Sequence, residues 1–242
     1  MPLHLSLLGA SELRGEDGAP IDAVLSQPKR LALLAFLAVD RPVRLHRRDS
    51  LLLLLWPESD ESHARGALSQ ALTFLRRSLG DGVIVTRGLE EVGVEPARIG
   101  TDVEAFTREA EAGSHGAALA RYRGDLLAGL HVSGCHEFDD WMSAERERLR
   151  AIAVRSARKA AESALSARDG STALLSAQHG LLLAPLDESL LEQVMLAHDL
   201  AGRPAVALHE YEEFRRRLRT EVGVEPSARL QALAARLRGA GG

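Results

Sequence analysis

The chain has 242 residues, of which 45% are hydrophobic and 26% charged, a composition typical of a folded globular protein. The single cysteine, Cys135, excludes an intrachain disulfide and fits a reducing cytosol. A net charge of −4 argues against a protein that binds nucleic acid strongly without regard to sequence. The start of the chain lacks a basic segment leading into an apolar run, and the densest apolar run, 51–56, is too short to span a bilayer. We therefore expect a cytoplasmic protein with no secretory signal and no membrane partner.

The first 25 residues are predicted to form short strands. Leu3, Leu5 and Leu7 alternate with polar residues, turn-forming residues follow at 16–20, and an apolar pattern resumes at 21–25. This pattern indicates an N-terminal antiparallel β-meander.

Three helices are predicted next. The first opens at Ser26-Gln-Pro28, where Ser26 can cap the helix and Pro28 lacks only an N–H that would be unpaired anyway, and it extends to about residue 39. The second runs from about residue 48 to Trp56 and stops at Pro57. We expect Trp56 to lie in the core. The third covers 62–79 and ends at Gly80.

The third predicted helix carries no acidic residue and separates an apolar face from a polar one. Leu68, Leu72, Leu75 and Leu79 recur at helical spacing and line one face. The other face carries side chains of the kinds that contact base edges and phosphates. These are Arg65, Ser69, Gln70, Thr73, Arg76 and Arg77.

A β-rich run at 83–87 and a second at 91–94 predict a hairpin directly after this helix. The order of meander, three helices and hairpin is that of a winged helix-turn-helix DNA-binding module. The tip of the hairpin, Leu89-Glu-Glu91, brings two carboxylates, which are unfavourable near phosphates and argue against deep insertion of the hairpin into DNA.

Basic residues gather just before the third helix as well as on it. Arg41, Arg44, Arg47 and Arg48 surround His46, whereas acidic residues concentrate elsewhere. A local basic face on an acidic protein favours a sequence-specific DNA contact. The alternative interpretation is that these arginines are simply solvated on surface helices.

Residues 95–98 mark the expected boundary between a domain at 1–98 and a second domain at 99–242. The second half shows helical patterns separated by explicit stops. The predicted helices are 103–112, 116–123, 138–168, 171–183, 188–201, 204–220 and 227–238. Ala173 and Leu174 recur as Ala207 and Leu208, a shift of 34 residues that is the tetratricopeptide period. We therefore expect an all-α domain of stacked helical hairpins.

The chain resembles the Streptomyces antibiotic regulatory protein family and the wider group of regulators with a bacterial transcriptional activator domain. In the first half the resemblance lies in the Gln-Pro-Lys-Arg-Leu run at 27–31, the Leu-Leu-Leu-Trp-Pro run at 53–57, residues 64–80 and the Val-Thr-Arg-Gly run at 85–88. In the second half it lies in Asp-Val-Glu-Ala-Phe at 102–106, residues 137–149 and Glu-Val-Gly-Val-Glu-Pro-Ser at 221–227.

The resemblance implies an OmpR-type winged helix followed by a tetratricopeptide-like activator domain. It implies that 62–79 is the recognition helix in the major groove, with Ser69, Gln70 and Thr73 toward the bases and the arginines mostly on phosphates. Arg87 would reach the minor groove from the hairpin. It also implies a homodimer on direct promoter repeats that recruits RNA polymerase, with the loop at 57–61 facing the polymerase. Larger domains of the family do not follow in this sequence, which is thus expected to be either a small stand-alone member or a fragment of a longer one.

Other chemistry finds little support in the sequence. Cys135 and His136 are adjacent and, with His131, suggest a loop rather than a metal site, because no second cluster stands at ligand spacing. Asp139 and Asp140 suggest the start of a helix rather than an acid–base pair, and Trp141 suggests a packing anchor rather than a ligand platform. We expect no enzyme activity, no cofactor and no metal. The alternative function is a helical scaffold whose winged helix no longer binds DNA.

Overall fold

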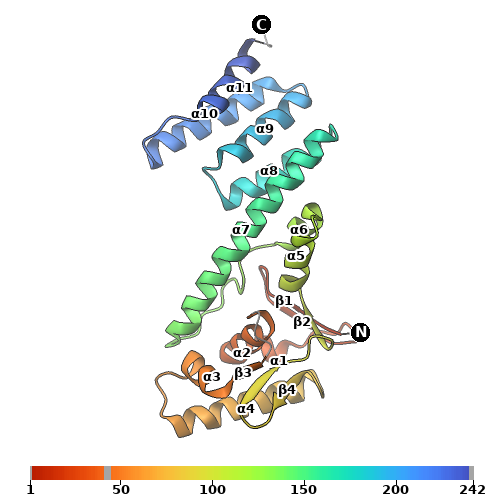
Figure 1. Ribbon diagram of the computed structural model, residues 1–242, viewed down its shortest axis with the longest axis vertical. Helices are drawn as coiled ribbons and strands as arrows, with labels where there is room; N and C mark the ends of the chain where they lie inside the picture. The colour runs from red at the N-terminus through yellow and green to blue at the C-terminus, as the bar shows by residue number, and fades with distance from the viewer. Residues whose placement is uncertain (1, 41–44, 240–242) are drawn as a thin grey trace. The chain divides into compact units, whose positions relative to one another are not determined.

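The structure, a computed structural model, describes residues 2–40 and 45–239, so Arg41 and Arg44 lie outside the described residues. Contacts divide the chain into two compact units (Figure 1). Unit 1 comprises 1–108 and 121–149, and unit 2 comprises 109–120 and 150–242. The division expected at 98/99 therefore falls inside unit 1, and the first part of α7 (His136–Ser166) belongs to that unit.

A three-stranded sheet explains why unit 1 extends beyond residue 98. Strand β1 (Leu3–Ser6) pairs with β2 (Glu12–Arg14) in the antiparallel sense and with β6 (Ile99–Thr101) in the parallel sense. At the start of α5 (Asp102–Glu111), the buried carboxylate of Asp102 accepts hydrogen bonds from the N–H groups of Leu7 at 2.8 Å and Leu8 at 3.0 Å. Residues after the expected boundary thus complete the sheet that the first strand begins.

The predicted meander is correct for β1 and β2 but wrong at 21–25, where the chain forms a single helical turn, α1 (Asp22–Leu25). The reason lies in the spacing of the apolar side chains. Ile21, Val24 and Leu25 stand at positions i, i+3 and i+4, which is the helical period and not strand alternation.

The three predicted helices of unit 1 are confirmed as α2 (Pro28–Val39), α3 (Arg48–Leu55) and α4 (Glu61–Leu79). Pro28 occupies the first turn of α2 as predicted, but the capping residue is Gln27, because the hydroxyl of Ser26 donates instead to the carbonyl of Ala23 at 3.2 Å. Trp56 ends α3 and is half-buried, not in the core as expected.

The predicted hairpin is also confirmed, as β4 (Ile84–Arg87) and β5 (Glu91–Val94). A strand that the sequence did not predict, β3 (Leu45–Arg47), pairs with β5 to give the antiparallel order β3-β5-β4. Three residues directly before a helix carry too little alternation to indicate a strand, so the pairing is set by the tertiary fold.

Leucine side chains from the helices and the first sheet form the core of unit 1. Fully or nearly fully buried are Leu5, Leu7, Leu33, Leu34, Leu51, Leu55, Leu68, Leu72 and Leu75. Trp141 at the start of α7 is the packing anchor that we predicted. Its indole N–H donates to the carboxylate of Asp40 at 3.0 Å, and its ring contacts Phe36 and Phe138 at centroid distances of 5.0 and 5.4 Å.

The described part of the chain after β6 is helical apart from its connecting loops and confirms all seven predicted helices. Beside α5 and α7 these are α6 (His115–Arg121), α8 (Gly170–Leu183), α9 (Glu188–Leu200), α10 (Pro204–Glu221) and α11 (Ala228–Gly239). No described helix is both long and apolar enough to cross a membrane.

Helices α8 and α10 of unit 2 repeat at the predicted spacing, since they begin 34 residues apart at Gly170 and Pro204. Ala173 and Ala207, the corresponding alanines, are both fully buried. Asp169 caps α8, and its hydrogen bonds with Thr172 and Ser171 lower the pKa of its carboxyl to about 2.

Candidate nucleic-acid interface

Helix α4 presents one face to the core of unit 1 and the other to solvent. Its buried residues are Ala64, Leu68, Ala71, Leu72, Leu75 and Leu79, which confirms the predicted apolar face. The helix begins at Asp60, whose carboxylate accepts the N–H of His63 at 3.0 Å, and ends at Gly80, whose φ of 86° few other residues adopt. These caps and the leucine pattern fix both the length and the rotation of α4.

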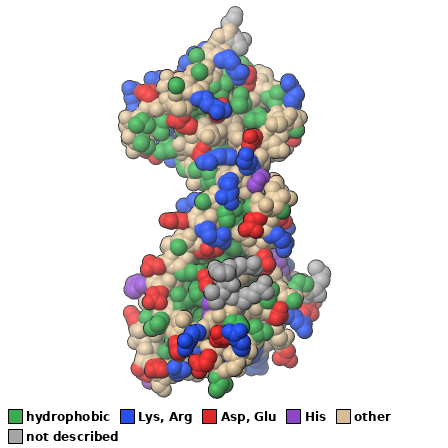
Figure 2. Space-filling view, in the orientation of Figure 1, with side chains coloured by type: hydrophobic (Ala, Val, Ile, Leu, Met, Phe, Trp, Pro, Cys, Tyr) green, Lys and Arg blue, Asp and Glu red, His purple; other side chains and the backbone are tan. Residues whose placement is uncertain are grey.

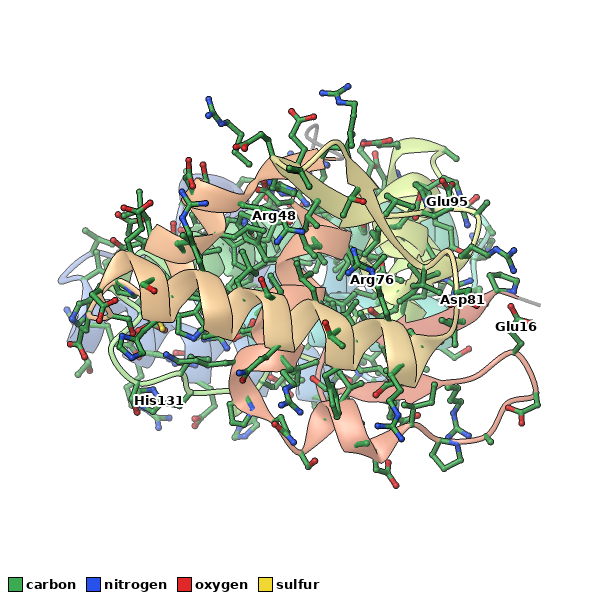
Figure 3. The ribbon with its side chains drawn as sticks, turned by 90° about the horizontal axis from the view of Figure 1, so that it is seen from below. Glu16, Arg48, Arg76, Asp81, Glu95 and His131 are labelled. Carbon is green, nitrogen blue, oxygen red and sulfur yellow. The ribbon has the colours of Figure 1, made fainter. Side chains whose placement is uncertain are left out.

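The predicted contact residues of α4 lie on or beside its solvent face. Ser69, Gln70, Thr73 and Arg77 are exposed, and Arg76 is half-buried. Because residues of an α-helix are about 100° apart, Gln70, Thr73 and Arg76 follow one another at steps of about 60°, with Thr73 in the middle. Figure 3 shows Arg76 and Arg48 on the side of α4 that carries the β4–β5 hairpin, and His131 on the other side.

Arg47 and Arg87 lie in one row across the second sheet, with an acidic residue between them. Glu91 on β5 is the register partner of Arg47 on β3 and of Arg87 on β4. Direct cross-strand partners point to the same face of a sheet. Glu91 therefore lies within β5 and not at the hairpin tip as expected from the sequence, and Arg47 and Arg87 flank it.

Two of the predicted DNA-binding arginines form intramolecular ion pairs. Arg87 donates to Glu91 at 2.5 Å, which lowers the pKa of Glu91 and raises that of Arg87. Arg65 donates to Glu61 of its own helix at 2.9 Å and to Asp49 of α3 at 3.0 Å. Figure 2 accordingly shows Lys and Arg side chains beside Asp and Glu side chains at the end of unit 1 that α4 and the hairpin form. The pairs of Arg65 are solvent-exposed, so exchanging them for phosphate contacts costs little, whereas the side chain of Glu91 is half-buried beside the exposed Arg87.

The other arginines near α4 differ from Arg65 and Arg87 in lacking a described ion-pair partner. Neither Arg76 nor Arg77 forms an ion pair with any of the residues that the structure describes. Arg48, at the first position of α3, is half-buried, and its Nε has no hydrogen-bond partner within the described ranges. The solvent face of α4 thus offers two guanidinium groups that no described carboxylate neutralises.

The structure gives Cys135 a packing role. Its buried thiol donates to the carbonyl of Leu55 at 3.2 Å, and burial raises the pKa of the thiol. Within the described part of the chain, no three side chains of His, Cys, Asp or Glu form a cluster able to hold a metal ion.

The sequence pattern did not identify Lys29 and Arg30 as site residues, although both belong to the run at 27–31. They stand in the first turn of α2 and line a groove beside α4 that also includes Gln70 and His131. The available signal was two adjacent cations at the start of a helix whose remaining residues are almost all apolar.

Comparisons with known proteins identify the family of the chain. The family model described as "Bacterial transcriptional activator domain" matches residues 94–238, more than half of the chain. The transcriptional regulatory protein EmbR of Mycobacterium tuberculosis is 27% identical over 97% of this chain, and the regulatory protein AfsR of Streptomyces coelicolor is 31% identical over 87%. The chain spans 63% of the length of EmbR and 22% of that of AfsR.

A solved structure of Mycobacterium tuberculosis EmbR in complex with a low-affinity phosphopeptide aligns over 98% of this chain and 65% of its own, with a TM-score of 0.68 at 23% sequence identity. That likeness concerns the fold alone. Together with the family match, the regulators EmbR, AfsR and DnrI confirm the resemblance inferred from the sequence. The chain belongs to the Streptomyces antibiotic regulatory protein family, the regulators with a bacterial transcriptional activator domain.

Proposed function

We propose that this chain is a sequence-specific DNA-binding transcriptional activator of the bacterial cytoplasm. In this proposal the helices and hairpin of unit 1 form a winged helix-turn-helix, and the helical second half is a tetratricopeptide-like activator domain. The observation that carries the proposal is the solvent face of α4, where exposed Ser69, Gln70 and Thr73 lie beside two arginines without described ion-pair partners.

The proposed mechanism is binding without bond chemistry. Helix α4 lies in the major groove, where Ser69, Gln70 and Thr73 contact base edges. Arg76 and Arg77 bind phosphates and set the register of the helix. When the hairpin meets the duplex, Arg87 leaves its ion pair with Glu91 and enters the minor groove. Arg47 and Arg48 add phosphate contacts from β3 and the start of α3.

One such module contributes limited affinity, so we further propose that two copies bind adjacent direct repeats as a homodimer. The turn between α3 and α4, residues 56–60, is exposed except for the half-buried Trp56. In the proposed complex it contacts RNA polymerase, which the activator recruits to the promoter.

The test is selection of duplexes from random-sequence DNA by the full chain, followed by titration of the selected duplex at several salt concentrations. We expect a defined motif and an association constant that falls steeply as salt rises, because phosphate contacts release counterions. A selection that returns no motif, with no binding to genomic fragments in a mobility-shift assay, would refute the proposal.

The competing function is a helical protein-interaction scaffold whose winged helix no longer binds DNA. The internal ion pairs of Arg65 and Arg87 and the net charge of −4 favour it. The same titration separates the two functions, because a scaffold would bind no duplex at low salt.

A further inference from the structure

A basic groove lies along one side of α4 within unit 1. Its volume is about 600 Å³, and it is lined by the start of α2, the middle of α4 and the loop at 131–133. Lys29, Arg30 and His131 supply its ionisable groups, and none of the described residues that line it is acidic. Since the whole chain has 34 acidic and 30 basic residues, a groove of this size without a carboxylate in its lining favours an anionic occupant.

Aromatic rings position both cations of the groove. The guanidinium of Arg30 lies 3.8 Å from the centroid of the Phe74 ring, and the ammonium of Lys29 lies 5.7 Å from that of Trp56. Neither cation forms an ion pair with the residues that the structure describes. A guanidinium stacked on a ring keeps the N–H groups at its edge available, which is the geometry that binds phosphate oxygens.

The groove borders the solvent face of α4. Gln70 belongs both to that face and to the lining of the groove. Arg76 lies about 120° further around the helix, on the side of the hairpin, with Thr73 between the two. In Figure 3 the labelled His131 of the groove and the labelled Arg48 lie on opposite sides of α4. Cations therefore flank the exposed face of this helix on both sides.

This arrangement matches the surroundings of a helix in the major groove, which is about 12 Å wide and has a sugar–phosphate backbone along each edge. Cations on only one side of α4 would contact one strand and leave the helix free to tilt. Cations on both sides would fix its tilt and depth against two strands.

We propose that Lys29 and Arg30 bind backbone phosphates of the DNA strand opposite to the one contacted from the hairpin side. This inference rests on the proposed function, in which α4 occupies the major groove. The two residues position the helix and contribute to affinity on every sequence, whereas Ser69, Gln70 and Thr73 determine which sequence is bound.

The first test compares salt dependence in the full chain, with the duplex that the wild type selects from random DNA as the probe. The slope of log association constant against log salt is negative, and the variant K29Q/R30Q should reduce its magnitude by about 1 to 2, at about 0.9 for each lost phosphate contact. The matched control is R14Q/R98Q, which removes two exposed positive charges from unit 1 on β2 and just before β6. An equal slope in K29Q/R30Q and the control would overturn the inference.

The second test identifies the strand, with duplexes in which single phosphates are replaced by neutral methylphosphonates. The wild type should lose affinity at positions on both strands. Binding of K29Q/R30Q should become insensitive to methylphosphonates on one strand only. Binding of R47Q/R87Q should become insensitive to methylphosphonates on the other strand. Insensitivity of both variants on the same strand would overturn the assignment.

Controls separate failure of this inference from failure of the proposed function. Thermal unfolding shows whether each variant folds, and if K29Q/R30Q unfolds, K29Q alone serves in its place, because Lys29 is the more weakly stacked cation. A wild type that binds no duplex overturns the proposed function together with this inference. A wild type that binds while K29Q/R30Q keeps the full slope overturns this inference only.

Discussion

Helices α4 and α10 both carry several arginines, yet they use them differently. All four arginines of α10, at 215, 216, 217 and 219, form ion pairs with glutamates at 212, 213, 221 and 225. On α4 only Arg65 is paired within the described residues, and Arg76 and Arg77 are not. The comparison shows that an arginine-rich helix indicates an anion-binding surface only where nearby carboxylates do not already neutralise it.

The largest effect is expected when the unpaired arginines of α4 are replaced. The double variant R76Q/R77Q should weaken binding to the selected duplex by roughly 10- to 100-fold, because two charge-assisted phosphate contacts are lost. The matched variant R216Q/R217Q removes the same charge from α10 and should leave the affinity nearly unchanged. Fluorescence anisotropy titrations measure both. Equal losses in the two variants would mean that total charge, and not the face of α4, determines binding.

Glycines inside the two units provide the second contrast. A Cβ at Gly180 of α8 would lie 2.7 Å from Leu190 and 2.9 Å from Ala157, whereas a Cβ at Gly66 of α4 would meet nothing within 4 Å. Gly180→Ala should therefore destabilise the protein by about 1–3 kcal/mol through overpacking. Gly66→Ala should stabilise it by up to about 1 kcal/mol through helix propensity.

Urea denaturation of the full chain measures the change in the free energy of unfolding for both alanine variants. A stabilised Gly180→Ala would contradict the close approach of Leu190 and Ala157 to Gly180, and a destabilised Gly66→Ala would contradict the open space beside Gly66.

The smallest effect is expected when Glu91, which competes with DNA for Arg87, is replaced. Because its pKa is lowered, Glu91 stays charged at neutral pH, and any stability that it contributes is lost only as pH falls through that lowered pKa, below the ordinary value of a glutamate. E91Q should therefore leave folding at pH 7 nearly unchanged and raise DNA affinity about two- to three-fold.

The matched control for this variant is E225Q, which removes the partner of Arg219 and one of the two partners of Arg215 on α10 and should not change DNA affinity. Anisotropy titrations at one fixed salt concentration decide the outcome. A loss of affinity in E91Q would show that Glu91 orients Arg87 for binding instead of competing with DNA.

Local sequence signals predicted much of the fold. Helix α4 was placed to within one residue at its start, because its leucine spacing and Gly80 are local features. The seven later helices and the β4–β5 hairpin were found for the same reason. The one error of type, at 21–25, came from reading helical spacing as strand alternation.

Features that depend on distant residues were not predicted. Strand β3 exists because it pairs with β5, and β6 because it pairs with β1. The carboxylate of Asp102 bonds to the backbone of residues more than ninety positions earlier, so no local signal placed the limit of unit 1. Truncation at 98 would remove both β6 and Asp102, which weighs against a stable 1–98 fragment.

The candidate site divides in the same way. The exposed polar residues of α4 follow from helical periodicity and were predicted. The ion pair between Arg65 and Asp49 and the groove that combines Lys29 with His131 join separate segments of the chain. The sequence therefore indicated which helix presents exposed polar and basic side chains, but not which cations are neutralised and which remain available.

The most direct test of the central claim is crosslinking from the middle of the α4 face. Thr73→Cys can be labelled selectively with a photoreactive group, because the native thiol of Cys135 is buried and its pKa is raised. The control is Arg216→Cys on α10. If α4 occupies the major groove, the Thr73→Cys protein will crosslink to bases of the selected duplex at least about ten-fold more than the control. Equal crosslinking from both positions, or none from position 73 in a protein that binds the duplex, would contradict the account.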